Sequence, residues 1–416
     1  MAQLGAAVLV AFPATLSEPA MQPAQRTDLG LAAAPVNPSE RIDAVDALRG
    51  LALFGVMAIN VSTEFRVSIF QQFLPRSTTS SALDSAAQIF LTTAVELKAF
   101  ALFSLLFGVG MAIQFERLAA SPRRAVLLVR RLIVLLAIGL VHLYLIWNGD
   151  ILTEYSFAGL LVLPLLWGPR WLLAAGAALF LVLYLAMPLW PPLVPWPTTI
   201  WIREHIVTAL QVYGTGGFSE ILAFQIREVA SIFPLHVAIF PRTLGLFLLG
   251  MLAWRMEIVR RPRDHRLLLL AVATTGILVG GALTVAEQMQ ALSGLRARYP
   301  LERLGTVMLA TGYAAALFAV LNTGTGKLML GWAAPLGRMA FTNYLAQSII
   351  FIWIFYGYGF GLFGRVGVLT ALAIGIAVYL SEVVFSAQWL RYYRFGPVEW
   401  LWRSLMYGTW QRLRRG

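Results

Sequence analysis

The chain has 416 residues, of which 59% are hydrophobic and only 12% charged, and its mean hydropathy is +0.74. Charged residues make up about a quarter of an ordinary soluble domain, so this composition excludes that class and predicts a protein that lies in a bilayer. The chain has no cysteine, which excludes disulfides, thiolate metal sites and a cysteine-linked acyl intermediate.

Ten mostly apolar runs, each long enough to cross a bilayer as a helix, are spaced along the chain. In chain order they lie at about 47–63, 95–114, 132–148, 151–167, 171–190, 236–255, 266–286, 304–321, 332–355 and 366–387. A spanning strand needs only about ten residues of alternating polarity, so runs of this length favour helices over a barrel. The predicted fold is an all-α polytopic transmembrane bundle of about ten spanning helices.

The arginines and lysines between the runs predict the orientation of the bundle. If the N-terminus is cytoplasmic, 20 of the 32 basic residues lie in inner segments and 8 in outer ones. Cytoplasmic loops are enriched in these residues, so both termini are expected to be cytoplasmic. The net charge of +12 then reflects topology and attraction to anionic lipid, and it gives no reason to expect nucleic acid as a partner.

The composition changes along the chain predict three regions. Residues 1–40 are expected to form a disordered tail, 41–390 the transmembrane helical domain, and 391–416 a basic amphipathic cytoplasmic segment. Two predicted outer loops, 64–94 and 191–235, are long. The second contains two amphipathic helices hinged at GTGG, which either act as a lid or rest among the lipid headgroups.

Polar and ionisable side chains inside the spans are the candidate functional residues, because burying them in lipid is costly. Those expected near the outer face are Asn60, His142, Asp150, Glu154 and Arg242. Those expected near the inner face are Asp46, Arg49 and Arg338, and Asn343 is expected in the middle of the ninth helix. Arg49 and Asn60 are separated by about 16 Å of helix, so they contact opposite ends of one long ligand or belong to two sites.

His142 is the candidate general base. The stretch HLYLIWNGDILTEY places Asp150 just past the following turn and Glu154 one helical turn further. A neutral histidine held by such a carboxylate suits base catalysis near neutral pH. The alternatives are a histidine that only satisfies a buried carbonyl and an Asp150 that only caps the next helix. Asp46 and Arg49 are likewise open to interpretation as an interfacial ion pair. The scattered histidines show no ligand spacing, so no metal site is predicted.

The stretch RIDAVDALRGLALFGVMAIN resembles the N-terminal signature of the YeiB family of bacterial inner-membrane proteins. Later motifs that resemble the same family, in the same order, are KAFALFSLLFGVGMA, HLYLIWNGDILTEYSFAGLLVLP, FPRTLGLFLLGM, GRMAFTNYLAQS and RFGPVEWLWRSLMYG. The resemblance runs from about residue 41 to 408 and implies a multi-pass protein of the bacterial cytoplasmic (inner) membrane. The family has no settled activity.

The first helix also resembles that of heparan-alpha-glucosaminide N-acetyltransferase and the wider transmembrane acyltransferases, which pass an acyl group from cytosolic acyl-CoA to a sugar on the far side. In that pattern an Arg-Gly at the inner end of the helix is followed eleven residues later by an Asn near the catalytic centre, as Arg49 and Asn60 are here. The pattern places a histidine in the loop after this helix. Residues 64–94 contain none, and His142 is the candidate to take its role.

The resemblance implies acetyl-CoA, or another acyl-CoA, as donor and a glycan or small polar molecule as acceptor. His142 would deprotonate the acceptor with Asp150 orienting its ring, and Asn60 would bind the acyl carbonyl or the acceptor. The expected substrate and CoA contacts are Asp46, Arg49, Arg338, Asn343, Arg242 and Glu154. The same buried polar groups also fit a transporter or exporter of a small metabolite, or a binding protein without turnover. Whether the protein forms a homodimer is left open.

Overall fold

A computed structural model describes residues 42–74 and 81–415, so the predicted tail 1–40 lies outside the described residues. Within these ranges the regular structure is helical, apart from one isolated bridge between Tyr393 and Arg414. Eight of the described helices are long and apolar enough to cross a bilayer, and two further apolar helices are shorter. The predicted all-α polytopic bundle is confirmed, and each of the ten predicted runs corresponds to one of these ten helices.

The long helices include several that end in a turn of π- or 3-10 helix. They are α1 (Asp43–Asn60) with η2 (Val61–Phe65), α2 (Ala82–Phe90) with η4 (Leu91–Val95) leading into α3 (Lys98–Arg117), α4 (Arg124–Val141) with η5 (His142–Ile146), α6 (Arg170–Ala186) with η7 (Met187–Leu189), α8 (Phe218–Arg255), α9 (Arg266–Gln288), α10 (Arg298–Leu321) and α14 (Val368–Tyr392). The shorter apolar helices are α5 (Leu152–Val162), continued by η6 (Leu163–Trp167), and α13 (Ala340–Phe355).

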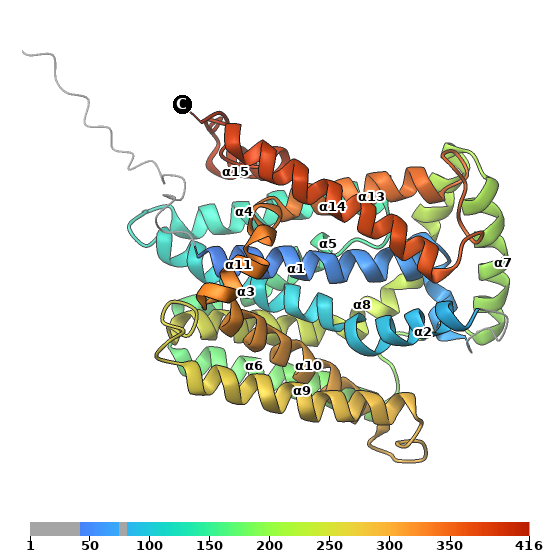
Figure 1. Cartoon of the computed structure of the whole chain (residues 1–416), viewed down its shortest axis with the longest axis horizontal. Helices are drawn as coiled ribbons and strands as arrows, with labels where there is room; N and C mark the ends of the chain where they lie inside the picture. Colours follow the sequence, from blue (N-terminus) through green and yellow to red (C-terminus); the bar gives the residue numbers. More distant parts are fainter. Residues whose placement is uncertain (1–41, 75–80, 416) are drawn as a thin grey trace, which may run out of the picture. The chain divides into compact units, whose positions relative to one another are not determined.

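Helix α1 forms the centre of the bundle. Of its most apolar stretch 72% is buried, against 17% for α6 and 22% for α9, which expose most of their apolar surface as lipid-facing helices do. Helix α1 contacts α3, α13 and α14 directly. We call the end at which α1 begins the Arg49 end and the end at which it finishes the Asn60 end (Figure 1).

The predicted run 332–355 is not one continuous helix, so that boundary was wrong. It begins as η8 (Gly331–Ala333) and α12 (Ala334–Arg338), preceded by α11 (Gly324–Leu330), and α13 starts only after a break at Met339. Pro335 in the first turn of α12 favours a new helix start there. Gly337 then brings α12 against α1, because a Cβ on Gly337 would overlap the carbonyl oxygen of Asp46.

The predicted outer loop 191–235 is only partly a loop. Helix α7 (Thr199–Thr215) stands across the Asn60 end of the bundle in Figure 1 and ends at the predicted glycine hinge. The second amphipathic helix is not separate: it continues into the following span, so α8 has 38 residues and contains Pro234 and Pro241. Within the other predicted outer loop, the short 3-10 helix η3 spans Ile69–Phe73.

The aromatic and basic C-terminal segment folds back onto the bundle. Its helix α15 (Pro397–Tyr407) packs on α4 and α13. The carboxylate of Glu399 accepts hydrogen bonds from the backbone N–H groups of Phe341 and Thr342 at 2.8 and 3.1 Å, and from the Thr342 hydroxyl at 2.5 Å. These N–H groups belong to the first turn of α13 and have no partner within their own helix, so Glu399 caps α13 from outside.

Candidate functional site

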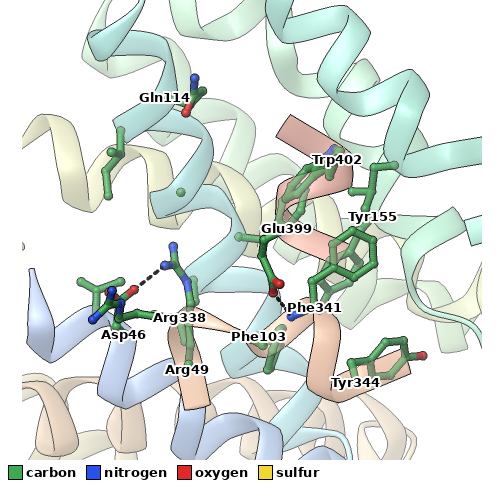
Figure 2. Close-up of a pocket in the computed structure, with 18 of the residues that line it drawn as sticks. Asp46, Arg49, Phe103, Gln114, Tyr155, Arg338, Phe341, Tyr344, Glu399 and Trp402 are labelled. Atoms are coloured by element: carbon green, nitrogen blue, oxygen red, sulfur yellow. Dashed lines mark hydrogen bonds and ion pairs between the residues drawn. The ribbon is translucent and has the colours of Figure 1, made fainter. Parts of the chain in front are cut away.

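A cavity of about 270 Å³ enters the bundle from the Arg49 end. Its lining residues on α1 run from Val45 to Val56, a rise of about 16 Å at 1.5 Å per residue. Figure 2 shows Asp46 and Arg49 on one side of this cavity, Glu399, Phe341 and Trp402 across from them, and Tyr344 set apart from both. Helices α1, α3, α4, α5, α13 and α15 all contribute to the wall.

The two parts of the cavity wall differ in polarity. At the Arg49 end the wall carries six arginines and two carboxylates, a net formal charge of +4: Arg49, Arg117, Arg131, Arg338, Arg394, Arg403, Asp46 and Glu399. Farther in it is apolar and aromatic, with Leu53, Val56, Phe103, Phe107, Ile151 and Tyr344. A polyanionic group therefore fits the cavity at its mouth, at the Arg49 end, and an uncharged chain fits the deep part of the cavity.

Several of the charged groups are held by neighbours. The guanidinium of Arg49 donates to Asp46 at 3.0 Å, as an interfacial pair would. The Arg131 guanidinium donates to Gln114 at 3.3 Å and stacks over the Trp402 ring at 4.3 Å. Trp402 in turn donates its indole N–H to the Arg131 carbonyl at 2.8 Å, which fixes α15 against α4. Burial raises the pKa of Glu399 above the usual glutamate value, against the opposing effect of its hydrogen bonds.

His142 and Asp150 form a buried pair next to the inner end of the cavity. The His142 Nδ1 atom lies 2.8 Å from an Asp150 oxygen, and the two residues are 0% and 2% exposed. The second Asp150 oxygen accepts from the Thr153 N–H at 2.7 Å, in the first turn of α5. The two interpretations of Asp150, a partner of His142 and a cap of the next helix, therefore both hold.

The other ring nitrogen of His142, Nε2, is buried and has no hydrogen-bond partner among the described residues. An Asp150 carboxylate that accepts from Nδ1–H leaves the lone pair on Nε2, which is the tautomer that a general base needs. His142 begins the π-helix η5, and such widened turns occur often at functional sites.

A second polar cluster lies at the Asn60 end. One Glu228 oxygen accepts from the Asn148 amide at 2.6 Å and from the Tyr213 hydroxyl at 2.5 Å, and the other lies 2.5 Å from His205 Nε2. Burial and the Glu228 charge raise the pKa of Tyr213 well above its usual value. Glu228, Asn148 and Tyr213 border a cavity of about 10 Å³, room for about one water, which Glu64 also lines.

The loop Trp147–Ile151, which contains the NGD sequence, separates the two cavities. Trp147 and Asn148 line the small cavity, whereas Ile151 lines the large one. Asp150, between them, holds His142. Gly149 lies against the Glu64 carboxylate, which a Cβ on Gly149 would meet at 2.5 Å. With Asn148 bound to Glu228 and Asp150 bound to His142, all three residues of the NGD sequence therefore face buried groups rather than solvent.

Glu154, Arg242, Asn343 and Asn60 do not line the large cavity. Glu154 is bound at 2.9 Å by His236 and at 2.6 Å by the Thr243 hydroxyl. Arg242 is 1% exposed and donates to the Leu97 carbonyl at 3.5 Å. Three of the four histidines in the chain are thus paired with a carboxylate.

Asn343 and Asn60 point elsewhere in the bundle. Asn343 donates to the Leu336 carbonyl at 3.2 Å and to the Ser386 hydroxyl at 3.0 Å, so it holds α13 against α12 and α14. Asn60 is 5% exposed, and its side-chain oxygen has no partner among the described residues. Asp46, Arg49 and Arg338 are the predicted contact residues that do line the large cavity.

Sequence reasoning missed several lining residues. Arg131, Tyr155 and Glu399 were not predicted as site residues, although all three line the large cavity. Glu228 and His205 at the other end were missed because their stretch was predicted to form two amphipathic helices outside the spans, where charged side chains are ordinary. For Glu399 the sequence offered one signal. In the motif GPVEWLWR this acidic residue stands among aromatic ones, as expected for a buried contact rather than for a helix in the lipid headgroups.

Comparisons with known proteins give the family. Residues 253–409 match a family model described as a protein of unknown function (DUF418). The chain is 33% identical over 409 residues to the uncharacterised protein YxaH of Bacillus subtilis, covering 92% of this chain and 98% of the relative. It is 30% identical over 388 residues to the uncharacterised protein YeiB of Escherichia coli, covering 88% of this chain and 96% of the relative. No solved structure matches the chain. The chain therefore belongs to the YeiB family of membrane proteins.

Proposed function

We propose that this protein is an integral membrane acyltransferase that takes an acyl group from acyl-CoA at the Arg49 end and passes it to a glycan or small polar acceptor at the Asn60 end. Acetyl is the acyl group we expect. The observation that carries the proposal is the arginine-lined cavity, whose inner end abuts the buried pair of His142 and Asp150. The resemblance of the first helix to those of transmembrane acyltransferases supports it.

The large cavity suits the shape and charge of an acyl-CoA. Phosphate groups bind well to arginines, which offer several N–H donors in a fixed planar arrangement, and six arginines stand at the Arg49 end. Trp402 provides an aromatic face on which the adenine could stack. The apolar inner wall formed by Leu53, Val56 and Phe107 suits the pantetheine arm and the acyl group. The basic end is also the one that the arginine distribution assigns to the cytoplasm, where acyl-CoA is made.

The proposed reaction needs one base. Nε2 of His142 takes the proton from the acceptor hydroxyl or amine as its oxygen or nitrogen attacks the thioester carbon. The carbon–sulfur bond then breaks, and the departing thiolate receives the proton from His142. No covalent enzyme intermediate is formed, and Asp150 stabilises the positive charge on the ring between the two steps.

The polar cluster at the Asn60 end is the natural place for the acceptor. Glu64 lines the small cavity there. Asn148, which lies in the same loop as Asp150, also lines this cavity and donates to Glu228. Helix α7 covers this end through Tyr213 and His205, as a lid would. The acceptor would thus approach the NGD loop from the face opposite the donor.

Release of free CoA from acetyl-CoA by the purified protein tests the proposal. With pooled cell-envelope sugars as acceptors, the wild type should release CoA, and His142→Ala should lower the rate at least about a hundredfold, as removal of a general base does. His265→Ala is the matched control, because His265 lies in the loop before α9 and pairs with no carboxylate in the described structure. If the wild type releases no CoA and acetyl-CoA does not raise its melting temperature, the proposal fails.

A second candidate function is export or transport of a small metabolite. The observation that favours it is the row of histidine–carboxylate pairs at and beyond the middle of the bundle, His142–Asp150, His236–Glu154 and His205–Glu228, which could move protons with a solute. Uptake into proteoliposomes that depends on a pH gradient, and not on acyl-CoA, would favour this function over acyl transfer.

A further inference from the structure

Tyr344 stands between the large cavity and His142. It lines the cavity, whereas His142 does not. The centroids of the Tyr344 and His142 rings are 5.3 Å apart, which is direct ring contact. In Figure 2 the Tyr344 hydroxyl points away from Asp46 and Arg49, so its ring is the part that closes the inner end of the cavity.

The hydroxyl of this ring makes two long hydrogen bonds to the loop Trp147–Ile151. The Tyr344 hydroxyl donates to the Gly149 carbonyl and accepts from the Ile151 N–H, both at 3.4 Å. Most hydrogen bonds of these types are between 2.7 and about 3.2 Å, so both are weak. The hydroxyl thus contacts the backbone on both sides of Asp150, in each case through a weak hydrogen bond.

A second tyrosine of the cavity wall provides the comparison. The Tyr155 hydroxyl lies 2.8 Å from the Ser104 hydroxyl and donates to the Phe100 carbonyl at 3.0 Å. Its ring packs on Phe107 and Phe247. The Tyr155 hydroxyl is therefore held by hydrogen bonds of ordinary length, whereas the Tyr344 hydroxyl is held by long ones and its ring contacts His142.

We infer that Tyr344 is a gate between the donor cavity and His142. In the described conformation the ring closes the passage, and breaking its two weak hydrogen bonds lets it swing aside and join the cavity to Nε2 of His142. The inference builds on the proposed function, in which donor and base must meet, and it goes further by naming the side chain that controls their meeting. A closed gate also keeps water away from a bound thioester until the acceptor is in place.

A single thiol in place of His142, behind the Tyr344 ring, tests the gate. Because the chain has no cysteine, His142→Cys introduces the only one. The probe is a small negatively charged methanethiosulfonate, which the arginines of the large cavity attract. The measured quantity is the rate at which the protein in detergent is modified.

Adding Tyr344→Phe keeps the ring but removes both hydrogen bonds. Modification should then be about tenfold faster, because the two weak hydrogen bonds together are expected to stabilise the closed ring about as much as one ordinary hydrogen bond does. Tyr155→Phe in the same background should leave the rate unchanged. Equal rates in all three proteins, or equal acceleration by Tyr155→Phe, would overturn the inference. Tyr344→Leu removes the ring altogether and should be modified faster still; if its melting temperature stays near that of His142→Cys and its rate does not rise, the gate is likewise excluded.

Saturating CoA separates this inference from the proposed function. If CoA fills the large cavity, it should slow modification of every variant. If Tyr344→Phe accelerates modification but CoA does not slow it, the gate stands and the donor assignment of the cavity fails.

Discussion

His142 can act as a base only if Nε2 carries the lone pair, and Asp150 determines this. In Asp150→Asn the amide oxygen can still accept from the Thr153 N–H, so the amide NH₂ faces His142 Nδ1. It then donates to that nitrogen and puts the ring proton on Nε2. We expect CoA release to fall about a hundredfold, as for loss of general base catalysis.

The measurement is the initial rate of CoA release at saturating acetyl-CoA, with the melting temperature recorded beside it. Asp264→Asn, in the exposed loop before α9, serves as the control. A full rate in Asp150→Asn would mean that the carboxylate only caps α5.

At the level of single residues, the sequence identified what lies within one local segment. His142 and Asp150 flank a single turn, so a short stretch of chain was enough to propose their pairing, beside a role of Asp150 as a helix cap, and the structure shows both contacts. Arg131 and Trp402 are 271 residues apart, and only the packing of α15 on α4 brings them together. No pattern in the sequence specifies such a contact, because the free energy that favours it comes from burial in the assembled bundle.

At the level of elements, the crossing of α1 and α12 sets the shape of the cavity mouth. Gly50 and Gly337 let the two backbones touch, and a Cβ on Gly337 would also lie 2.8 Å from the Gly50 nitrogen. Gly337→Ala should therefore lower the free energy of unfolding by about 1–3 kcal/mol, the usual cost of overpacking. Chemical denaturation in mixed micelles measures this.

Gly281→Ala on α9 is the matched control for that crossing. Nothing lies within 4 Å of its would-be Cβ, so alanine should raise the stability by up to about 1 kcal/mol through its better helix propensity. If both variants change stability by the same amount, the close approach of α1 and α12 is not what Gly337 provides.

The cap that α15 places on α13 should depend on pH. Because burial raises the pKa of Glu399, the folded protein favours the protonated side chain. Its contribution to stability is then fully present below the usual glutamate pKa, about 4.3, and is lost as pH rises through the higher pKa of the folded state. We expect the melting temperature of the wild type, relative to Glu399→Gln, to fall as pH is raised from about 4 to about 7.

Thermal unfolding of the two proteins across this pH range gives the comparison, and the other titrating groups cancel in the difference. A relative melting temperature that rises with pH would show that the hydrogen bonds from Phe341 and Thr342 outweigh the effect of burial.

At the level of the whole molecule, the orientation of the bundle decides which face of the membrane the large cavity meets. Trp254, at the end of α8, lines that cavity, so the loop between α8 and α9 lies at the Arg49 end. The positive-inside rule predicts that this end is cytoplasmic. Asp264→Cys in that loop and Ser293→Cys in the loop after α9 are both at exposed positions.

In intact cells, a membrane-impermeant maleimide should label Ser293→Cys and should label Asp264→Cys only after permeabilisation. The cysteine-free chain gives no background. The reverse pattern would place the arginine-lined cavity outside the cell, away from acyl-CoA, and would contradict the proposed function.

The sequence by itself determined that the chain is an all-α membrane bundle and where along the chain its ten apolar helices lie, and it offered the pairing of His142 with Asp150 as one of several alternatives. It could do so because spanning helices are specified by the length of apolar runs, and local pairs by a few residues of separation. The tertiary structure alone decided that the arginines of five separate segments share one cavity, that Asn343 and Arg242 serve packing away from it, and that Tyr344 covers His142. These contacts join residues far apart in the chain, and side-chain packing between helices, which hydropathy does not encode, selects them.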